Sequence, residues 1–248
     1  MGKRELSGIY HRAELYDAIY SGRGKDYQAD SMAIAKRIFE RNGSASSLLD
    51  VACGTGAHLK HFAGLFAQVE GLDLAPDMVR VARRALPGVP VHEGDMTAFL
   101  LDRTFDAITC LFSSVGYLSD AGQLDAALRC FARHLNPGGV IVLEPWYFPE
   151  NATSSSVVGD VVTDGDRKLS RVSRAVRTEG AHHMEVHYLV ADPRSGIHHF
   201  SDTHILSLFE RRRYETAFEG AGCTAEFLPA GESGGPGLFV GTKPKTEG

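Results

Sequence analysis

Short runs of apolar residues alternate with amphipathic segments over residues 47–148. Between the apolar runs, the intervening segments repeat their apolar positions at helical spacing, at 56–66, 75–86 and 121–135. Strands that are apolar throughout and separated by helices predict a parallel sheet that is covered on both faces. The apolar runs, each predicted to be one strand, fall at 47–52, 69–74, 89–95, 105–112 and 140–148. We expect "NPGG", at 136–139, to form a turn before the fifth strand.

The segments that flank this core follow other patterns. Two helices are predicted before it, at 11–20 and 26–41, and the second is expected to end on a left-handed cap at Asn42-Gly43. After Pro149 the polarity alternates with period two, and turn signals separate the segments, which predicts an inserted antiparallel sheet of three or four strands. A helix near 211–222 and a closing hairpin, 223–229 with 237–243, would complete the main sheet.

The predicted organisation therefore has three parts. Residues 1–150 form N-terminal helices and an α/β core, 151–206 form the inserted sheet, and 207–248 return to the core. The formal net charge is −5, which argues against nucleic acid as a partner because binding to phosphate backbones requires a basic face. No apolar stretch approaches the roughly 20 residues of a membrane span. The four scattered cysteines suggest a cytoplasmic protein with buried thiols.

The turn after the first core strand contains glycines, which predicts that a ligand binds close to its backbone. It reads "DVACGTGAHL" and contains Gly54 and Gly56. A dinucleotide fingerprint would need a third glycine at Leu59, and a phosphate loop would need Gly-Lys-Ser/Thr, but neither is present. The turn would lie at the carboxyl ends of the parallel strands, where open sheets of this kind bind their ligands.

Three acids at the strand ends narrow the choice of ligand. Asp50 precedes the turn, Asp73 ends the second strand, where a carboxylate can hold both ribose hydroxyls, and Asp95 ends the third, where it can hold an adenine amino group. This spacing describes a site for S-adenosylmethionine, whose adenosine would lie across the strand ends. The cofactor contains no pyrophosphate, so the third glycine is not needed.

Several longer motifs carry a resemblance to a known family. "DVACGTG", "GLDL" and "GDM" are similar to the first motifs of class I S-adenosylmethionine-dependent methyltransferases. "AELYDAIYSGRGKDY", "FSSVGYL", "EPWYFPE", "RVSRAVRTEG" and "GLFVG" resemble the N-methyltransferases of nucleotide-linked amino sugars, which make the dimethylamino sugars of macrolide antibiotics. The resemblance implies a Rossmann-like, mostly parallel seven-stranded sheet with an N-terminal helical cover and an inserted antiparallel sheet. It also implies a homodimer that converts S-adenosylmethionine to S-adenosylhomocysteine while it methylates a thymidine-diphosphate-linked amino sugar, usually twice.

The cofactor-binding residues follow from the strand ends and from this resemblance. Tyrosines on the N-terminal helices would cover the sulfonium, and a carbonyl at the end of the fourth strand would accept from the cofactor's ammonium group. The predicted set is Tyr16, Tyr27, Asp50, Ala52, Gly54, Gly56, Asp73, Leu74, Asp95, Met96, Phe112 and Ser113.

The predicted substrate residues lie above the same pocket. Tyr117 is expected to orient the amine, with proton acceptance as an alternative, although similar proteins often have histidine there. Glu144 and Trp146 would contact the sugar or base. Arg171 and Arg177 share one strand face and would serve the diphosphate. Where relatives have "GRGLF", this chain has Pro236 in place of the arginine.

Six histidines lie in the predicted insertion, but a metal site is not expected. Residues four apart on a strand are roughly 13 Å apart, too far for two ligands of one zinc ion. We expect these histidines on an outward or dimer-facing surface. The alternative functions are methylation of another small amine or hydroxyl, and a regulator that binds the cofactor without turnover. The histidines are His182, His183, His187, His198, His199 and His204.

Overall fold

A seven-stranded sheet forms the core of the protein, in the order β10-β11-β5-β4-β1-β2-β3. The computed structural model describes residues 8–230 and 235–245. Five neighbouring strands are parallel, as predicted, and the closing hairpin places β11 antiparallel to both of its neighbours. The strands are β1 (Ser47–Val51), β2 (Gln68–Asp73), β3 (Val91–Glu93), β4 (Phe105–Cys110), β5 (Leu135–Leu143), β10 (Thr224–Leu228) and β11 (Leu238–Thr242).

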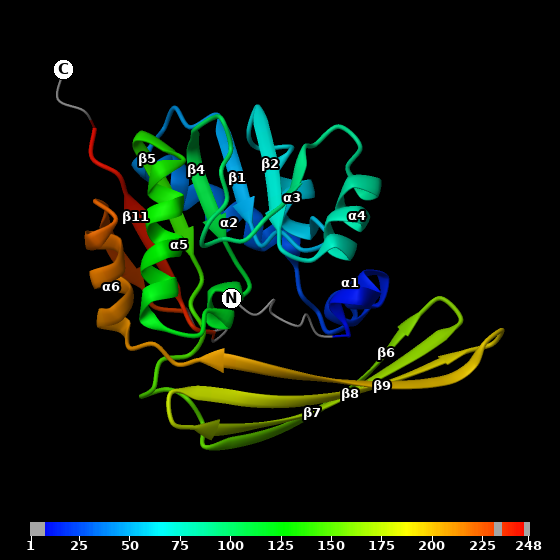
Figure 1. Ribbon diagram of the computed structural model, residues 1–248. Coiled ribbons are helices and arrows are strands. Elements are labelled where there is room, and N and C mark those ends of the chain that lie inside the picture. Colours follow the sequence, from blue (N-terminus) through cyan, green and yellow to red (C-terminus); the bar gives the residue numbers. More distant parts are fainter. Residues whose placement is uncertain (1–7, 231–234, 246–248) are drawn as a thin grey trace.

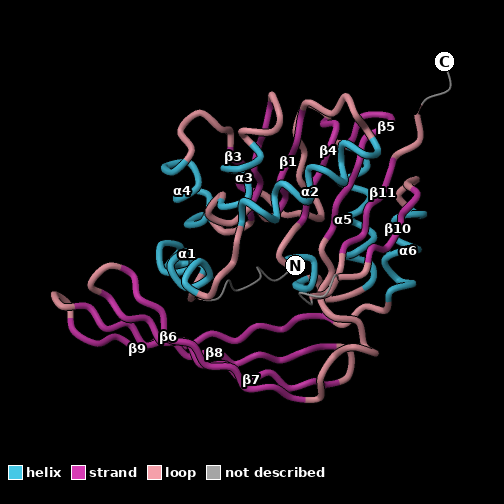
Figure 2. Tube along the Cα trace, turned by 180° about the vertical axis from the view of Figure 1, so that it is seen from behind, coloured by secondary structure: helices cyan, strands magenta, loops and turns pink. Residues whose placement is uncertain are grey.

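Helices cover both faces of this sheet (Figures 1 and 2). On one face, α5 (Ala121–Arg133) and α6 (Arg211–Gly220) bury a core that includes Leu49 and Ile108. On the other, α2 (Tyr27–Arg41), α3 (Ala57–Phe62) and α4 (Pro76–Ala85) bury Leu48 and its neighbours. Because successive strand residues point to opposite faces, the unbroken apolar runs supply both cores.

Two local expectations were wrong. The predicted turn at 136–139 is part of β5: Phe105 pairs with Leu135 and Ala107 with Val140, so the extra residues form an irregularity inside the strand. The cap at Asn42 is not left-handed, since its φ is −135°. The Asn42 side chain instead accepts from the amide and the hydroxyl of Ser44, which turns the chain without a positive φ.

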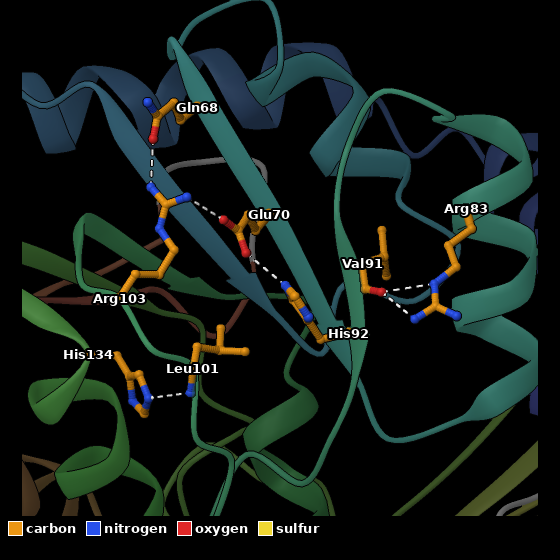
Figure 3. A network of polar contacts seen from close by, with 8 residues as sticks. All are labelled: Gln68, Glu70, Arg83, Val91, His92, Leu101, Arg103 and His134. Atoms are coloured by element: carbon orange, nitrogen blue, oxygen red, sulfur yellow. Dashed lines mark hydrogen bonds and ion pairs between the residues drawn. The ribbon is translucent and has the colours of Figure 1, made fainter.

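The segment after β3 is held by polar contacts at the edge of the sheet (Figure 3). Glu70 on β2 is buried and accepts from Arg103 at 2.6 Å and lies 2.7 Å from His92 Nε2. His134 Nε2 accepts from the amide of Leu101 at 3.0 Å. These contacts fix the course of the segment that leads from the end of β3 to the start of β4.

The inserted sheet has four antiparallel strands in the order β6-β7-β8-β9, within the predicted number. In Figure 1 it lies beneath the core, with α1 (Ala13–Gly22) between them. Its inner face buries Val162, Leu169 and Tyr188 against Ile9 and Ile19 of the N-terminal segment. The strands are β6 (Ser155–Asp164), β7 (Arg167–Thr178), β8 (Ala181–Asp192) and β9 (Gly196–Ser207).

The N-terminal segment joins the two sheets. Asp202 on β9 is buried and accepts from the amides of Gly8 and Ile9 just before the short helix η1 (Tyr10–Arg12). On α1, Asp17 accepts from Thr55 in the glycine turn at 2.5 Å. The helical cover is therefore tied to the inserted sheet at one end and to the core at the other. No described helix is long and apolar enough to span a membrane.

Candidate active site

The glycine turn after β1 keeps its backbone open. Ala52, Gly54 and Gly56 all have positive φ, at 58°, 57° and 86°. A Cβ at Gly54 would meet nothing within 4 Å, so its surface faces free space, whereas Gly56 is close to the Leu86 side chain and is the N-cap residue of α3. A residue with a side chain at Gly54 would stand between the turn and any ligand.

Asp73 organises this turn at the end of β2. Its carboxylate accepts from the amides of Gly54 and Ala75, both at 2.8 Å. Burial nevertheless raises the pKa of Asp73 above its usual value. At the end of β3, Asp95 accepts from the amide and hydroxyl of Thr97 and closes the neighbouring turn. Both acids line one cavity.

That cavity has a volume of about 1120 Å³ and lies between the strand ends, the N-terminal helices and the inner face of the inserted sheet. Residues that follow each of the five parallel strands line it. The predicted site residues that line it are Tyr16, Ala52, Gly54, Asp73, Leu74, Asp95, Met96, Phe112, Ser113, Tyr117, Glu144, Trp146 and Arg171.

Four predicted residues do not line the cavity. Tyr27 packs edge-on against His58, Gly56 lies against Leu86, and Asp50 is buried beneath the turn. Arg177 is exposed and donates to the carbonyl of Pro149 at 2.7 Å. Arg171 and Arg177 share a strand face, but they are six positions apart on β7, and Arg177 lies next to the end of the strand at Thr178.

The ends of β4 and β5 are locked together beside the cavity. Phe112 and Ser113 have positive φ, an uncommon conformation for residues with side chains. Glu144 accepts from the Phe112 amide at 2.9 Å, and the Ser113 hydroxyl donates to the Pro145 carbonyl at 2.7 Å. Burial raises the pKa of Glu144. The strained turn is thus held by two specific contacts, which suits a backbone that serves a ligand.

Two histidines of the inserted sheet face the cavity, contrary to the expectation of an outward surface. His182 Nδ1 accepts from the indole of Trp146 at 3.2 Å, and its Nε2 lies 3.0 Å from the Thr153 carbonyl. His204 lies beside Tyr117. His187 and His199, by contrast, are on the exposed side of the sheet. In the described part of the chain, no group of three or more His, Cys, Asp or Glu side chains could hold a metal ion.

The sequence reasoning missed Tyr10, Tyr20 and His204, which also line the cavity. Tyr16 and Tyr20 lie 4.6 Å apart between ring centroids, and Tyr20 meets Phe112 edge-on at 4.9 Å. The sequence does hold a signal for His204, because the turn at 192–196 sets the hairpin register and pairs His204 with Met184, which alternates in step with the buried Val186 and Tyr188.

Asp50 gives this region a pH-dependent stability. Its carboxylate is 2% exposed and accepts from Thr109 at 2.7 Å, and burial raises its pKa to about 6. A raised pKa means that the folded state favours the protonated acid, so this contribution to stability is present below the unfolded pKa and is lost as the pH rises through about 6. For Asp50→Asn, urea unfolding should lose a pH-dependent component on the order of 3 kcal/mol between pH 4 and 7. An unchanged pH dependence would contradict the assignment.

The cavity meets the requirements of S-adenosylmethionine. The turn at Gly54 is open, Asp73 and Asp95 lie at adjacent strand ends, and aromatic rings cover the opposite side. The hydroxyl of Tyr27 is buried without a hydrogen-bond partner, at the edge of this region. The sheet order and the strand-end site together define a class I methyltransferase.

Comparison with known proteins narrows this class. A methyltransferase-domain family matches residues 48–139. The chain is 51% identical to a dTDP-3-amino-3,4,6-trideoxy-alpha-D-glucopyranose N,N-dimethyltransferase of Streptomyces venezuelae, over 92% of this chain and 96% of that protein. The protein belongs to the family of S-adenosylmethionine-dependent amino-sugar N-methyltransferases.

Solved structures agree with this assignment. The crystal structure of Streptomyces venezuelae DesVI matches with a TM-score of 0.90 at 51% identity, and covers 94% of this chain and 98% of that one. S-adenosylmethionine-bound CalS10, an amino pentose methyltransferase of calicheamicin biosynthesis from Micromonospora echinaspora, matches with a TM-score of 0.85 at 44% identity, and covers 98% and 100%.

Proposed function

We propose that this protein transfers methyl groups from S-adenosylmethionine to the amine of a thymidine-diphosphate-linked amino deoxysugar, and adds two of them, in antibiotic biosynthesis. The observation that carries the proposal is one cavity that has acidic residues on one wall and a buried arginine on the opposite wall. Strand ends with Asp73 and Asp95 form one side, and a sheet with the buried Arg171 forms the other. Such a division suits a nucleoside cofactor on the core side and an anionic substrate on the sheet side.

On the core side, we assign the cofactor to the acids and open backbone of the strand ends. Asp73 and Asp95 would hold ribose and adenine, and the turn at Gly54 would receive the methionine end, with Tyr16 as cover. When bound, the cofactor supplies a methyl group that is already activated on a sulfonium. The chain's own task is then to exclude water and to aim an unprotonated amine.

On the sheet side, we assign Arg171 to the diphosphate, Tyr117 to orientation of the amine, and Glu144 and Trp146 to the sugar or base. Arg171 is 7% exposed, and its Nε atom is buried without a partner. Its guanidinium donates to the Ser173 hydroxyl and the Met184 sulfur, and it also interacts with the Tyr188 hydroxyl. Because Pro236 lines the cavity where relatives have arginine, Arg171 would carry more of the phosphate contact here.

The test uses labelled cofactor with a panel of 3-amino and 4-amino deoxysugars, each with and without the thymidine diphosphate. Mass spectrometry should show two added methyl groups on a nucleotide-linked sugar and none on the free sugar. If the methyl group is transferred only to another small amine or to a hydroxyl, the protein is a methyltransferase with a different substrate. Tight cofactor binding without transfer to any acceptor would support a regulator.

We further propose a cytoplasmic homodimer that associates through the outer face of the inserted sheet. This face exposes several large apolar side chains to solvent among polar ones, and the four cysteines are buried and unpaired, which suits a reducing compartment. Sedimentation of the protein and of Val161→Glu tests the dimer, since a charge there should shift the protein to monomer. The exposed apolar residues of this face are Val157, Val161, Val172, Leu189, Ile197 and Ile205.

A further inference from the structure

Three side chains form a hydrogen-bonded chain in the cavity wall. The Tyr10 hydroxyl donates to the Tyr117 oxygen at 2.8 Å, and that oxygen lies 2.9 Å from Nδ1 of His204. They come from η1, from η2 (Ser114–Tyr117) after β4, and from β9, so the fold brings together residues 87 to 107 positions apart. All three line the cavity.

The direction of the chain follows from its proton count. A tyrosine hydroxyl has one proton. Because Tyr117 accepts from Tyr10, we assign its own proton to the contact with His204 Nδ1, which is then an acceptor, with the ring proton on Nε2. The Tyr117 oxygen keeps a second lone pair for a donor in the cavity. Among the described residues, His204 Nε2 has no hydrogen-bond partner.

The surroundings of His204 keep its ring neutral near pH 7. It is 7% exposed, and burial lowers its pKa, helped by Arg171 on β7 and opposed by Asp202 on its own strand. Asp202 is engaged by the amides of Gly8 and Ile9. The other titratable groups that face the ring are Tyr10 and Tyr117, and burial raises the pKa of Tyr117, so its hydroxyl stays protonated.

We propose that His204 is the terminal acceptor for the proton that the substrate's ammonium group must lose, and that Tyr117 relays it. The inference rests on the proposed function. One N–H bond of the ammonium breaks and an O–H bond forms on Tyr117. At the same time Tyr117 gives its original proton to Nδ1 of His204. The nitrogen keeps the electron pair as a neutral amine, and the imidazolium releases its Nε2 proton to water.

This arrangement never requires a tyrosinate, because Tyr117 receives one proton as it loses another. His204 acts through Tyr117 and is a positioning residue, whereas Tyr117 contacts the amine. The relay also serves dimethylation, since the nitrogen carries a proton again after the first methyl group is added. A second proton must leave before the second methyl group can be added, and the same chain can take it once exchange with water has returned the His204 proton to Nε2 and left Nδ1 free to accept.

The test is His204→Asn, whose side-chain oxygen can accept from Tyr117 near the position of Nδ1 but cannot take a proton. We expect kcat for the nucleotide-linked amino sugar to fall by about 10- to 100-fold at pH 7, with KM unchanged. The deficit should shrink at alkaline pH, where water removes the proton before the substrate binds. Tyr117→Phe should give the same pH profile, and the double variant should be no slower than either single one.

His134→Asn is the matched control, because His134 is also a buried, hydrogen-bonded histidine, but it contacts Leu101 and Cys130 and does not line the cavity. It should lower Tm and keep the wild-type shape of the pH profile. A loss for His204→Asn that is equal at every pH, no loss, or the same altered profile in His134→Asn would overturn the proposal.

A measurement without substrate separates this proposal from the proposed function. In ¹⁵N-histidine NMR of the free protein, His204 should carry its proton on Nε2, and Tyr117→Phe should shift its Nδ1 resonance. A proton on Nδ1 would overturn the relay even if the enzyme methylates the expected sugar. If the histidine has the expected tautomer but no nucleotide-linked amino sugar is methylated, the proposed function fails instead.

Discussion

Asp73→Asn should weaken S-adenosylmethionine binding by about 100-fold or more. The two carboxylate oxygens of Asp73 accept from the amides of Gly54 and Ala75. An asparagine has one oxygen, so its NH₂ group must face one of these amides or turn away. The glycine turn then loses a contact that sets its shape, and the ribose hydroxyls lose a charged acceptor.

Isothermal titration calorimetry with S-adenosylmethionine measures this loss directly. Asp102→Asn is the matched control, because it removes the same charge from an exposed position in the segment before β4. It should bind the cofactor as the wild type does. Equal affinity in Asp73→Asn and the wild type would show that the nucleoside binds elsewhere.

Arg171→Met should raise KM for the nucleotide-linked sugar by about 100-fold, through the loss of charge-assisted hydrogen bonds to the diphosphate. The affinity for S-adenosylmethionine should stay the same. Tm should change little, because the hydrogen-bond partners of the guanidinium, Ser173, Met184 and Tyr188, are all neutral. Asp160, directly opposite on β6, is paired with Arg23 instead.

Arg174→Met controls for this change, since Arg174 is on the same strand but on the exposed face. Steady-state kinetics should show a wild-type KM for Arg174→Met. A similar rise in both variants would indicate long-range attraction by net charge. An unchanged KM in Arg171→Met would assign the diphosphate to another group.

Local patterns were enough to predict the order and type of most elements. Apolar runs that alternate with helices of period 3.6 mark a covered parallel sheet wherever they occur, because each strand must bury both faces. The errors were local as well. "NPGG" has turn chemistry, but the backbone of Gly138 and Gly139 is hydrogen-bonded to Lys243, and β5 pairs with β4 on either side of it, so tertiary hydrogen bonds outweigh such preferences.

The inserted sheet shows where this reasoning stops. Side chains alternate between the two faces of a strand, which places Arg171 and Arg177 on one face of β7. The alternation does not reveal how far along that face the cavity extends. Only the docking of the inserted sheet under η1 and α1 buries Arg171 and leaves Arg177 outside. Because of the same docking, His182 and His204 face the cavity, although the sequence led us to expect the histidines of this sheet on an outward or dimer-facing surface.

By itself, the sequence determined the parallel sheet and the open turn at Gly54. It also determined that Asp73 and Asp95 line the same site, since the carboxyl ends of parallel strands share one edge of the sheet. The tertiary structure decided that Tyr10, Tyr117 and His204 form one chain. Their contact depends on the packing of segments 87 to 107 residues apart, and no local periodicity encodes that distance.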